Sequence, residues 1–162
     1  MNAAIGANLH DRMLVTNHVL AGAVIGAALR RRPALAFGLG VASHLAMDAL
    51  PHWGLPRGPE SHARFLRVAY RDGTVGLAAL CLLGARATGG RRRVVLAGMA
   101  GAAILDIDKP ARHFFGRNPV PERIQRFHED IQREAPHRMP GEFIAGAALL
   151  IVASGLLRRS RA

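Results

Sequence analysis

The chain has 162 residues, enough for one folded domain and too few for two sizeable cores. Half of the residues are hydrophobic but only 5% are aromatic, so the apolar mass is aliphatic, which excludes a disordered or fibrous protein. The single cysteine, Cys81, excludes a disulfide framework and a cysteine-based zinc site. The formal net charge is +11, but no basic block is interleaved with aromatic residues, so we expect no nucleic-acid partner.

Five charge-free apolar runs, rich in alanine and glycine, predict five short helices in an all-α fold, because none of the runs alternates with a period of two. The runs cover 13–29, 33–47, 73–85, 94–105 and 143–157. They are joined by a three-arginine turn at 30–32, a proline-rich stretch at 51–60, an arginine-rich turn near 86–93 and a polar segment at 109–141.

The polar segment contains one further predicted helix, an amphipathic surface helix near 121–134. Its apolar stripe consists of Ile124, Phe127 and Ile131, and its other faces are charged. His128 lies outside the stripe, so we expect it to be solvated.

The lengths of the apolar runs leave two architectures open, since a bilayer span needs roughly 20 apolar residues. One is a membrane bundle of short helices, and the other is a soluble bundle whose central helices are buried all round. Small residues four apart, as in Gly22–Gly26 and Ala97–Gly101, favour the membrane bundle. If every run crosses once, the arginine clusters at 30–32, 91–93 and 158–161 lie on one side, which the positive-inside rule makes cytoplasmic.

We expect residues 13–162 to form a single helical membrane domain. Residues 1–12 lack a basic region followed by an apolar core, so they do not resemble a cleavable signal peptide. They are expected to be a disordered leader, or to precede a true start at Met13.

Ionisable residues inside or at the ends of apolar runs are the main functional signal, because such residues are costly at membrane depth. His44 and Asp48 are four apart and therefore share a helix face, and His52 follows four residues later. Imidazole and carboxylate groups are ligands for zinc and similar metals. A buried His–Asp hydrogen bond that holds a helix end is the alternative interpretation.

In the five-crossing arrangement these ionisable residues all fall on one side, opposite the arginine clusters. The predicted metal ligands are His18, His44, Asp48, His52, Asp106 and Asp108. One of Asp106 and Asp108 is expected to be a helix-end residue, because residues two apart on a helix do not share a face. Asp72 or Glu134 is predicted as a further ligand or a catalytic general base, although Asp72 could instead be the N-cap or a first-turn acid of the helix that it opens.

The segments NHVLAGAVIGA and SHLAMDALPHW resemble a poorly characterised family of bacterial inner-membrane proteins described as membrane-bound, metal-dependent hydrolases. The resemblance covers 14–54 well and 104–110 loosely. It places the family's motif residues at His18, His44, Asp48, Asp106 and Asp108, and implies a multi-pass protein of the bacterial inner (cytoplasmic) membrane. A more distant similarity is to zinc-dependent phospholipase C, which also uses His-x3-Asp on helices.

The first functional hypothesis is a membrane-embedded hydrolase with a divalent metal, zinc first and manganese or iron next, that acts on a lipid-like ester or phosphoester. Its site would lie on the extracytoplasmic face, among membrane lipids; no protein partner is indicated. The alternative is a non-enzymatic integral membrane protein in which His–Asp pairs fix helix packing. A metal or proton transporter is disfavoured, because the ionisable residues gather at one end of the helices.

Overall fold

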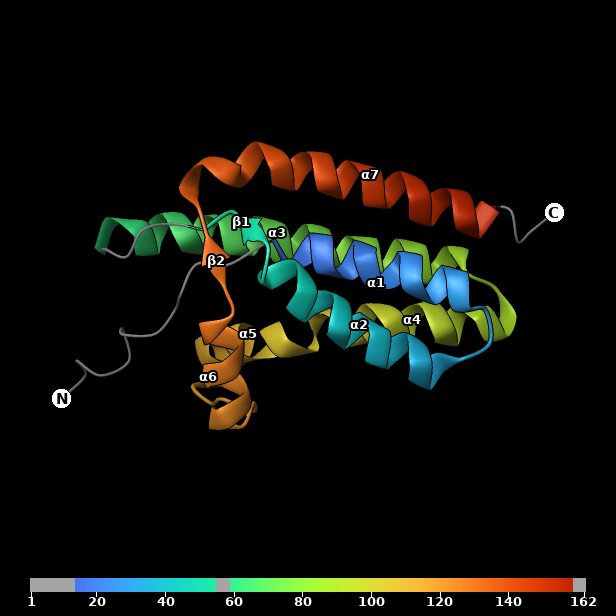
Figure 1. The fold of residues 1–162 in the computed structure, drawn as a ribbon, viewed down its shortest axis with the longest axis horizontal. Helices are drawn as coiled ribbons and strands as arrows, with labels where there is room; N and C mark the ends of the chain where they lie inside the picture. The colour runs from blue at the N-terminus through green and yellow to red at the C-terminus, as the bar shows by residue number, and fades with distance from the viewer. Residues whose placement is uncertain (1–13, 55–58, 159–162) are drawn as a thin grey trace.

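A computed structural model describes residues 14–54 and 59–158, and nearly all of them are helical (Figure 1). The α-helices are α1 (Val15–Leu29), α2 (Pro33–Asp48), α3 (Pro59–Arg86), α4 (Gly89–Ala103), α5 (Asp108–Phe115), α6 (Glu122–Asp130) and α7 (Met139–Arg158). Two 3-10 turns, η1 (Ile104–Ile107) and η2 (Pro136–Arg138), and two short strands, β1 (Pro51–His52) and β2 (Arg133–Glu134), complete the described residues. The all-α fold class is confirmed, whereas the predicted leader at 1–12 and Met13 lie outside the described residues.

Each of the five apolar runs is a helix, but α3 begins at Pro59, well before the predicted start at 73. Its first half carries Arg64, Arg67 and Arg71, which interrupt the apolar run in the sequence and are exposed in the structure. Leu66 packs on the opposite side, against a small core formed by Leu14 and Trp53. Helix α3 is therefore amphipathic at its start, a pattern that a search for charge-free runs does not detect.

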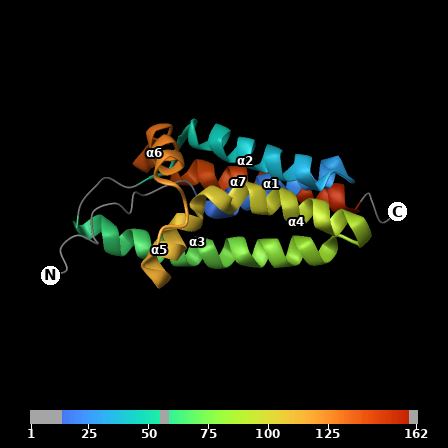
Figure 2. The ribbon, with the colours of Figure 1, turned by 90° about the horizontal axis from the view of Figure 1, so that it is seen from below.

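Helix α1 is the centre of the bundle, because it contacts α2, α3, α4 and α7. Figure 1 shows these helices side by side, with α7 along one edge and α5 and α6 gathered at one end. Figure 2 shows the same end from below, where α6 lies beside the last turn of α2. The parallel pairing of β1 with β2 lies at this end too, and brings residues 51–52 against 133–134.

Glycines allow α4 to pack closely against α1 and α2. A Cβ on Gly22 of α1 would lie 2.3 Å from the carbonyl oxygen of Gly98 in α4, and one on Gly40 of α2 would lie 2.4 Å from the same atom. A Cβ on Gly26 would meet the carbonyl oxygen of Val94 at 2.6 Å. Only glycine fits at such backbone contacts, so the small-residue spacing read from the sequence does mark a helix interface.

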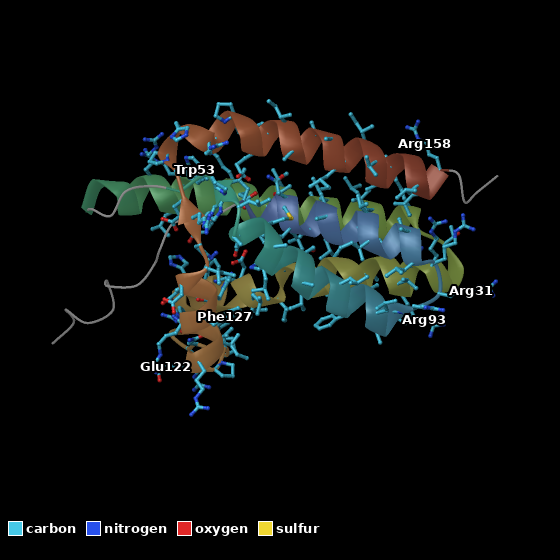
Figure 3. The ribbon with its side chains drawn as sticks, in the orientation of Figure 1. Arg31, Trp53, Arg93, Glu122, Phe127 and Arg158 are labelled. Carbon is cyan, nitrogen blue, oxygen red and sulfur yellow. The ribbon has the colours of Figure 1, made fainter. Side chains whose placement is uncertain are left out.

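Described arginines from each of the three clusters lie together at the end of the bundle away from α5 and α6, as the alternation of helix directions requires. Figure 3 shows Arg31, Arg93 and Arg158 there, and Trp53 and Phe127 towards the opposite end. One arginine of this end, Arg91, donates hydrogen bonds from Nη2 to the carbonyl oxygens of Ala27 and Leu156, at 2.7 and 3.1 Å. These bonds satisfy carbonyls in the last turns of α1 and α7, which lack partners within their own helices.

Among the described residues, two helical segments are long and apolar enough to cross a membrane, namely Leu66–Arg86 and Pro136–Arg158. Helices α1, α2 and α4 have only 15 or 16 residues, and at about 1.5 Å per residue they fall short of a 30 Å hydrocarbon core. The expectation of five membrane crossings is thus supported for two helices. Both of these expose large apolar side chains, such as Leu77 at 63% and Ile151 at 72%.

Replacement of Gly98 by alanine should disrupt the packing of α4 against α1. The added methyl would lie 2.3 Å from the Gly22 carbonyl oxygen, so we expect the free energy of unfolding to fall by about 1–3 kcal/mol or more. Thermal unfolding of the purified protein in detergent, followed by circular dichroism, measures this. Gly38→Ala is the matched control, because no atom lies within 4 Å of a Cβ built there; equal melting temperatures for the two variants would contradict the prediction.

Candidate metal centre

Three buried histidines and one aspartate meet where α1, α2 and α6 come together. His18 comes from the first turn of α1, His44 and Asp48 from the last turns of α2, and His128 from α6. His18 Nε2 lies 3.2 Å from Asp48 Oδ1, and His44 Nε2 lies 3.1 Å from Asp48 Oδ2. His128 Nε2 lies 2.6 Å from Asp48 Oδ2 and 2.8 Å from His44 Nε2. We call these four residues the His/Asp cluster; each is 2% exposed or less.

The backbone of α4 fixes the orientation of the His44 ring. Its Nδ1 lies 2.6 Å from the carbonyl oxygen of Ala102, so Nδ1 carries a proton and donates it to that oxygen. In a neutral imidazole Nε2 is then left with its lone pair, and here it faces the carboxylate of Asp48 and the Nε2 of His128. This lone pair can accept a hydrogen bond from His128 Nε2, and a second proton on the ring or a metal ion would offset its repulsion from the carboxylate.

Asp106, in η1, stands beside the cluster and links it to a cation. Its Oδ1 lies 4.0 Å from His44 Nε2 and accepts a 2.6 Å hydrogen bond from Lys109 Nζ. Burial of this carboxyl raises its pKa, but the charges of Lys109 and His44 more than offset that effect, so its pKa lies below the usual value. Asp106 is therefore a carboxylate at neutral pH.

The donor atoms fit a divalent metal. Two sets of three place one ligand atom per residue within 4.8 Å of one another, namely His18, His44 and Asp48, and His44, Asp106 and His128. Donors about 2 Å from one ion lie roughly 3–4 Å apart, which is close to the separations found here. Asp48 Oδ1 is also buried without a hydrogen-bond partner among the described residues, and a bound cation would satisfy it. A histidine oriented by a backbone carbonyl, as His44 is, is common at zinc sites, and imidazoles with carboxylates are a donor set that zinc accepts.

Of the predicted metal ligands, His18, His44, Asp48 and Asp106 come together, whereas His52 and Asp108 belong to neither set. The helix ends before His52, which lies in β1 and donates from Nδ1 to the Leu50 carbonyl oxygen at 2.8 Å. Asp108 is buried at the start of α5, with Oδ2 3.9 Å from an Arg112 guanidinium nitrogen. Asp108 thus faces Arg112, as expected for one of the two aspartates.

The two predicted catalytic carboxylates lie outside both sets. Asp72 lies in the middle of α3, and its carboxylate accepts hydrogen bonds from the backbone nitrogens of Val15 and Thr16 at 2.6 and 3.2 Å. It thus accepts from the backbone N–H groups at the N-terminus of α1, a helix that lies far from Asp72 in the sequence. Glu134 lies in β2 opposite His52, and its side chain covers Gly54.

The prediction that His128 is solvated is wrong, since only 2% of it is exposed. The predicted stripe is reversed as well: Ile124 and Phe127 are 44% and 54% exposed, and the polar face of α6 packs inward. Gln132, one turn after His128, donates from Nε2 to Asp48 Oδ2 at 3.0 Å. The hydrogen bonds of His128 and Gln132 to the buried Asp48 carboxylate thus decide which face of α6 packs inward, rather than burial of its apolar stripe. The four-residue spacing of His128 and Gln132 is the sequence signal that could have indicated this face.

A second buried polar contact holds α7 beside this end of the bundle. Glu142, in the first turn of α7, accepts hydrogen bonds from Asn17 Nδ2 at 2.7 Å and from the backbone nitrogen of Trp53 at 3.2 Å. Asn17 precedes His18 in α1, so this contact fixes the segment that presents His18. The sequence analysis did not single out Asn17.

No family model, curated protein or solved structure matches the chain. The chemistry of the His/Asp cluster therefore has to be argued from its own geometry.

We expect Asp72→Ala to destabilise the fold, because it leaves the first backbone N–H groups of α1 without their acceptor. The loss should be about 1–2 kcal/mol in the free energy of unfolding, as for other helix caps. Thermal unfolding in detergent measures it, and Glu122→Ala is the control, since the Glu122 carboxylate is exposed and pairs only with Arg126 in its own helix turn. A general base without a structural role would instead leave the stability of Asp72→Ala equal to that of the control.

Proposed function

We propose that the chain is a membrane-embedded, metal-dependent hydrolase in which His18, His44, Asp48 and His128 hold one divalent metal ion, zinc first. The observation that carries the proposal is the convergence of three imidazole Nε2 atoms on one buried carboxylate. The resemblance of 14–54 to membrane-bound metal-dependent hydrolases supports the same class of activity.

Each residue of the cluster has a separate task in this proposal. His44 is held in its metal-binding orientation by the Ala102 carbonyl, a bond of the kind that fixes zinc-bound histidines. Asp48 supplies negative charge, and Gln132 keeps its Oδ2 oriented. When bound, a zinc ion lowers the pKa of water towards 7 and polarises the oxygen of a scissile bond. Asp106 stands 4.0 Å from His44 Nε2 and is a further carboxylate that could serve as a ligand of the ion.

A membrane location is part of the proposal. Its support is the apolar surface of α3 and α7, on which Leu77, Phe143 and Ile151 are each more than 60% exposed. Large contiguous apolar surfaces of this kind are rare on water-exposed monomers. The arginine end of the bundle would face the cytoplasm of a bacterium, so the His/Asp cluster would open towards the extracytoplasmic side.

The metal content of the detergent-purified protein tests the site. We expect near-stoichiometric zinc, manganese or iron by elemental analysis, lost in His44→Ala/Asp48→Ala and retained in His137→Ala, whose histidine is exposed. Wild-type protein that is metal-free, and that stays empty on titration with these ions, would contradict the proposal. In that case a drop in thermal stability on His44→Ala would support the alternative of structural His–Asp pairs, which the hydrogen bonds to Asp48 already permit.

His128 gives a more selective test, because it comes from α6, which lies at the end of the bundle, and not from α1 or α2, which pack against α4 (Figure 1). We expect His128→Ala to weaken zinc affinity by at least 10–100-fold, measured by competition with a chromogenic chelator. The helical circular dichroism of the variant should match that of the wild type. Unchanged zinc affinity in a folded His128→Ala would remove this residue from the site.

A further inference from the structure

A cleft of about 540 Å³ lies between α3 and the η1–α5 segment, directly beside the His/Asp cluster. Its volume falls within the range of small-molecule sites, roughly 300–1,000 Å³. Most of its lining is apolar and includes Leu14, Trp53, Leu66, Leu77, Ile107 and Phe114. An occupant that fills the cleft must therefore be largely hydrocarbon.

The polar groups of the cleft include the two residues that connect it with the cluster. Asp106 belongs both to the cleft wall and to one of the metal-compatible sets. Lys109 also lines the cleft, and its ammonium group uses one N–H for Asp106 at 2.6 Å. An ammonium group carries three N–H donors, so Lys109 can hold an anionic group in the cleft while it keeps its bond to Asp106.

A second pair of polar side chains, Tyr70 and His113, lies in the cleft wall and joins α3 to α5. The Tyr70 hydroxyl and His113 Nε2 are 2.6 Å apart. Both groups can form hydrogen bonds with a polar headgroup. The other polar residues of the lining are Asp72 and Thr74 of α3, together with Asp106 and Lys109.

The rim of the cleft is part of the apolar outer surface. Leu77 and Phe114, on opposite walls, are 63% and 62% exposed. The α3 wall belongs to Leu66–Arg86, one of the two segments able to cross a membrane. A cleft along such a helix opens sideways towards hydrocarbon, the direction from which a lipid chain enters.

We propose that this cleft binds an anionic amphiphile, with a hydrocarbon chain along Leu66 and Leu77 and a phosphate headgroup at Lys109. The proposal deepens the function proposed above and rests on it in one respect: the headgroup then lies beside Asp106 and the His/Asp cluster. The substrate class assigned to the cluster is accordingly a lipid phosphoester.

Trp53 allows binding to be measured without any metal, because it is the single tryptophan of the chain and lines the cleft. Metal-free protein in a neutral detergent is titrated with lysophosphatidic acid that carries bromine atoms, which quench tryptophan, on its acyl chain. We expect saturable quenching of Trp53 fluorescence. The same titration with brominated lysophosphatidylcholine, whose headgroup has no net charge, should saturate at about tenfold higher concentration.

Two variants locate the binding. Gly73 lines the cleft and a Cβ there meets no atom within 4 Å, so a side chain can begin there without a clash and the ring of Gly73→Phe would occupy part of the cleft. We expect it to weaken binding at least tenfold, while Gly38→Phe, equally unobstructed on α2 and absent from the lining, leaves binding unchanged. Lys109→Gln should bring the affinity for lysophosphatidic acid down to that for lysophosphatidylcholine.

Equal quenching in Gly73→Phe and Gly38→Phe would overturn the proposal, since the lipid would then reach Trp53 by another route. Equal affinity for the two lipids in the wild type would remove the headgroup contact at Lys109. Complete competition by inorganic phosphate would show a site for the anion alone and would likewise overturn it. Zinc binding by Gly73→Phe, measured separately, should match the wild type, so a failure of the cleft is distinguishable from a failure of the metal site.

Discussion

The close contact of α4 with α1 and α2 is the constraint on which the rest of the structure depends. At Gly22, Gly40 and Gly98 the helices approach until a single Cβ would collide with a carbonyl oxygen, so the three backbones have one possible spacing. That spacing brings the Ala102 carbonyl of α4 within 2.6 Å of His44 Nδ1. The orientation of a ligand-type imidazole is thus set by backbone packing rather than by flexible side chains. The glycines that allow close helix packing therefore also fix the orientation of the His44 ring.

Asp48 connects the bundle with the polar segment that follows α5. Its two oxygens face His18 of α1, His44 of its own helix and both His128 and Gln132 near α6. A buried carboxylate without such partners would cost several kcal/mol, so these contacts are a condition for burying it at all. The arrangement also explains why α6 turns its apolar stripe outward: the helix is docked by charge and hydrogen bonds. Its exposed Phe127 lies towards the end of the bundle opposite the labelled arginines (Figure 3).

The sequence predicted the part of the cluster that depends on local spacing and helix direction. His44 and Asp48 share a face because they are four apart on one helix, and His18 joins them because α1 and α2 are antiparallel neighbours. Contacts set by chain reversals could not be predicted in this way. The helix ends at Asp48, so His52 lies in β1, and Asp72 serves the N-terminus of a helix 56 residues away. His128 was missed because a hydrophobic stripe usually marks the buried face, and in α6 it does not.

Charged side chains are arranged differently at the two ends of the bundle. At the arginine end, guanidinium groups such as that of Arg91 donate hydrogen bonds to carbonyl oxygens at helix ends, and the other described arginines face outward. At the other end, carboxylates and imidazoles turn inward around Asp48, and Lys109 is held against Asp106. Because Asp106 is shared by the cluster and by the apolar cleft, a ligand in that cleft would place its polar end within reach of the His/Asp cluster. Within the described residues the hydrogen bonding of the cluster is incomplete, since His18 Nδ1 and Asp48 Oδ1 are buried without hydrogen-bond partners. In the proposed function, the cleft beside Asp106 and Lys109 would give a substrate access to the cluster, which a purely structural cluster would not require.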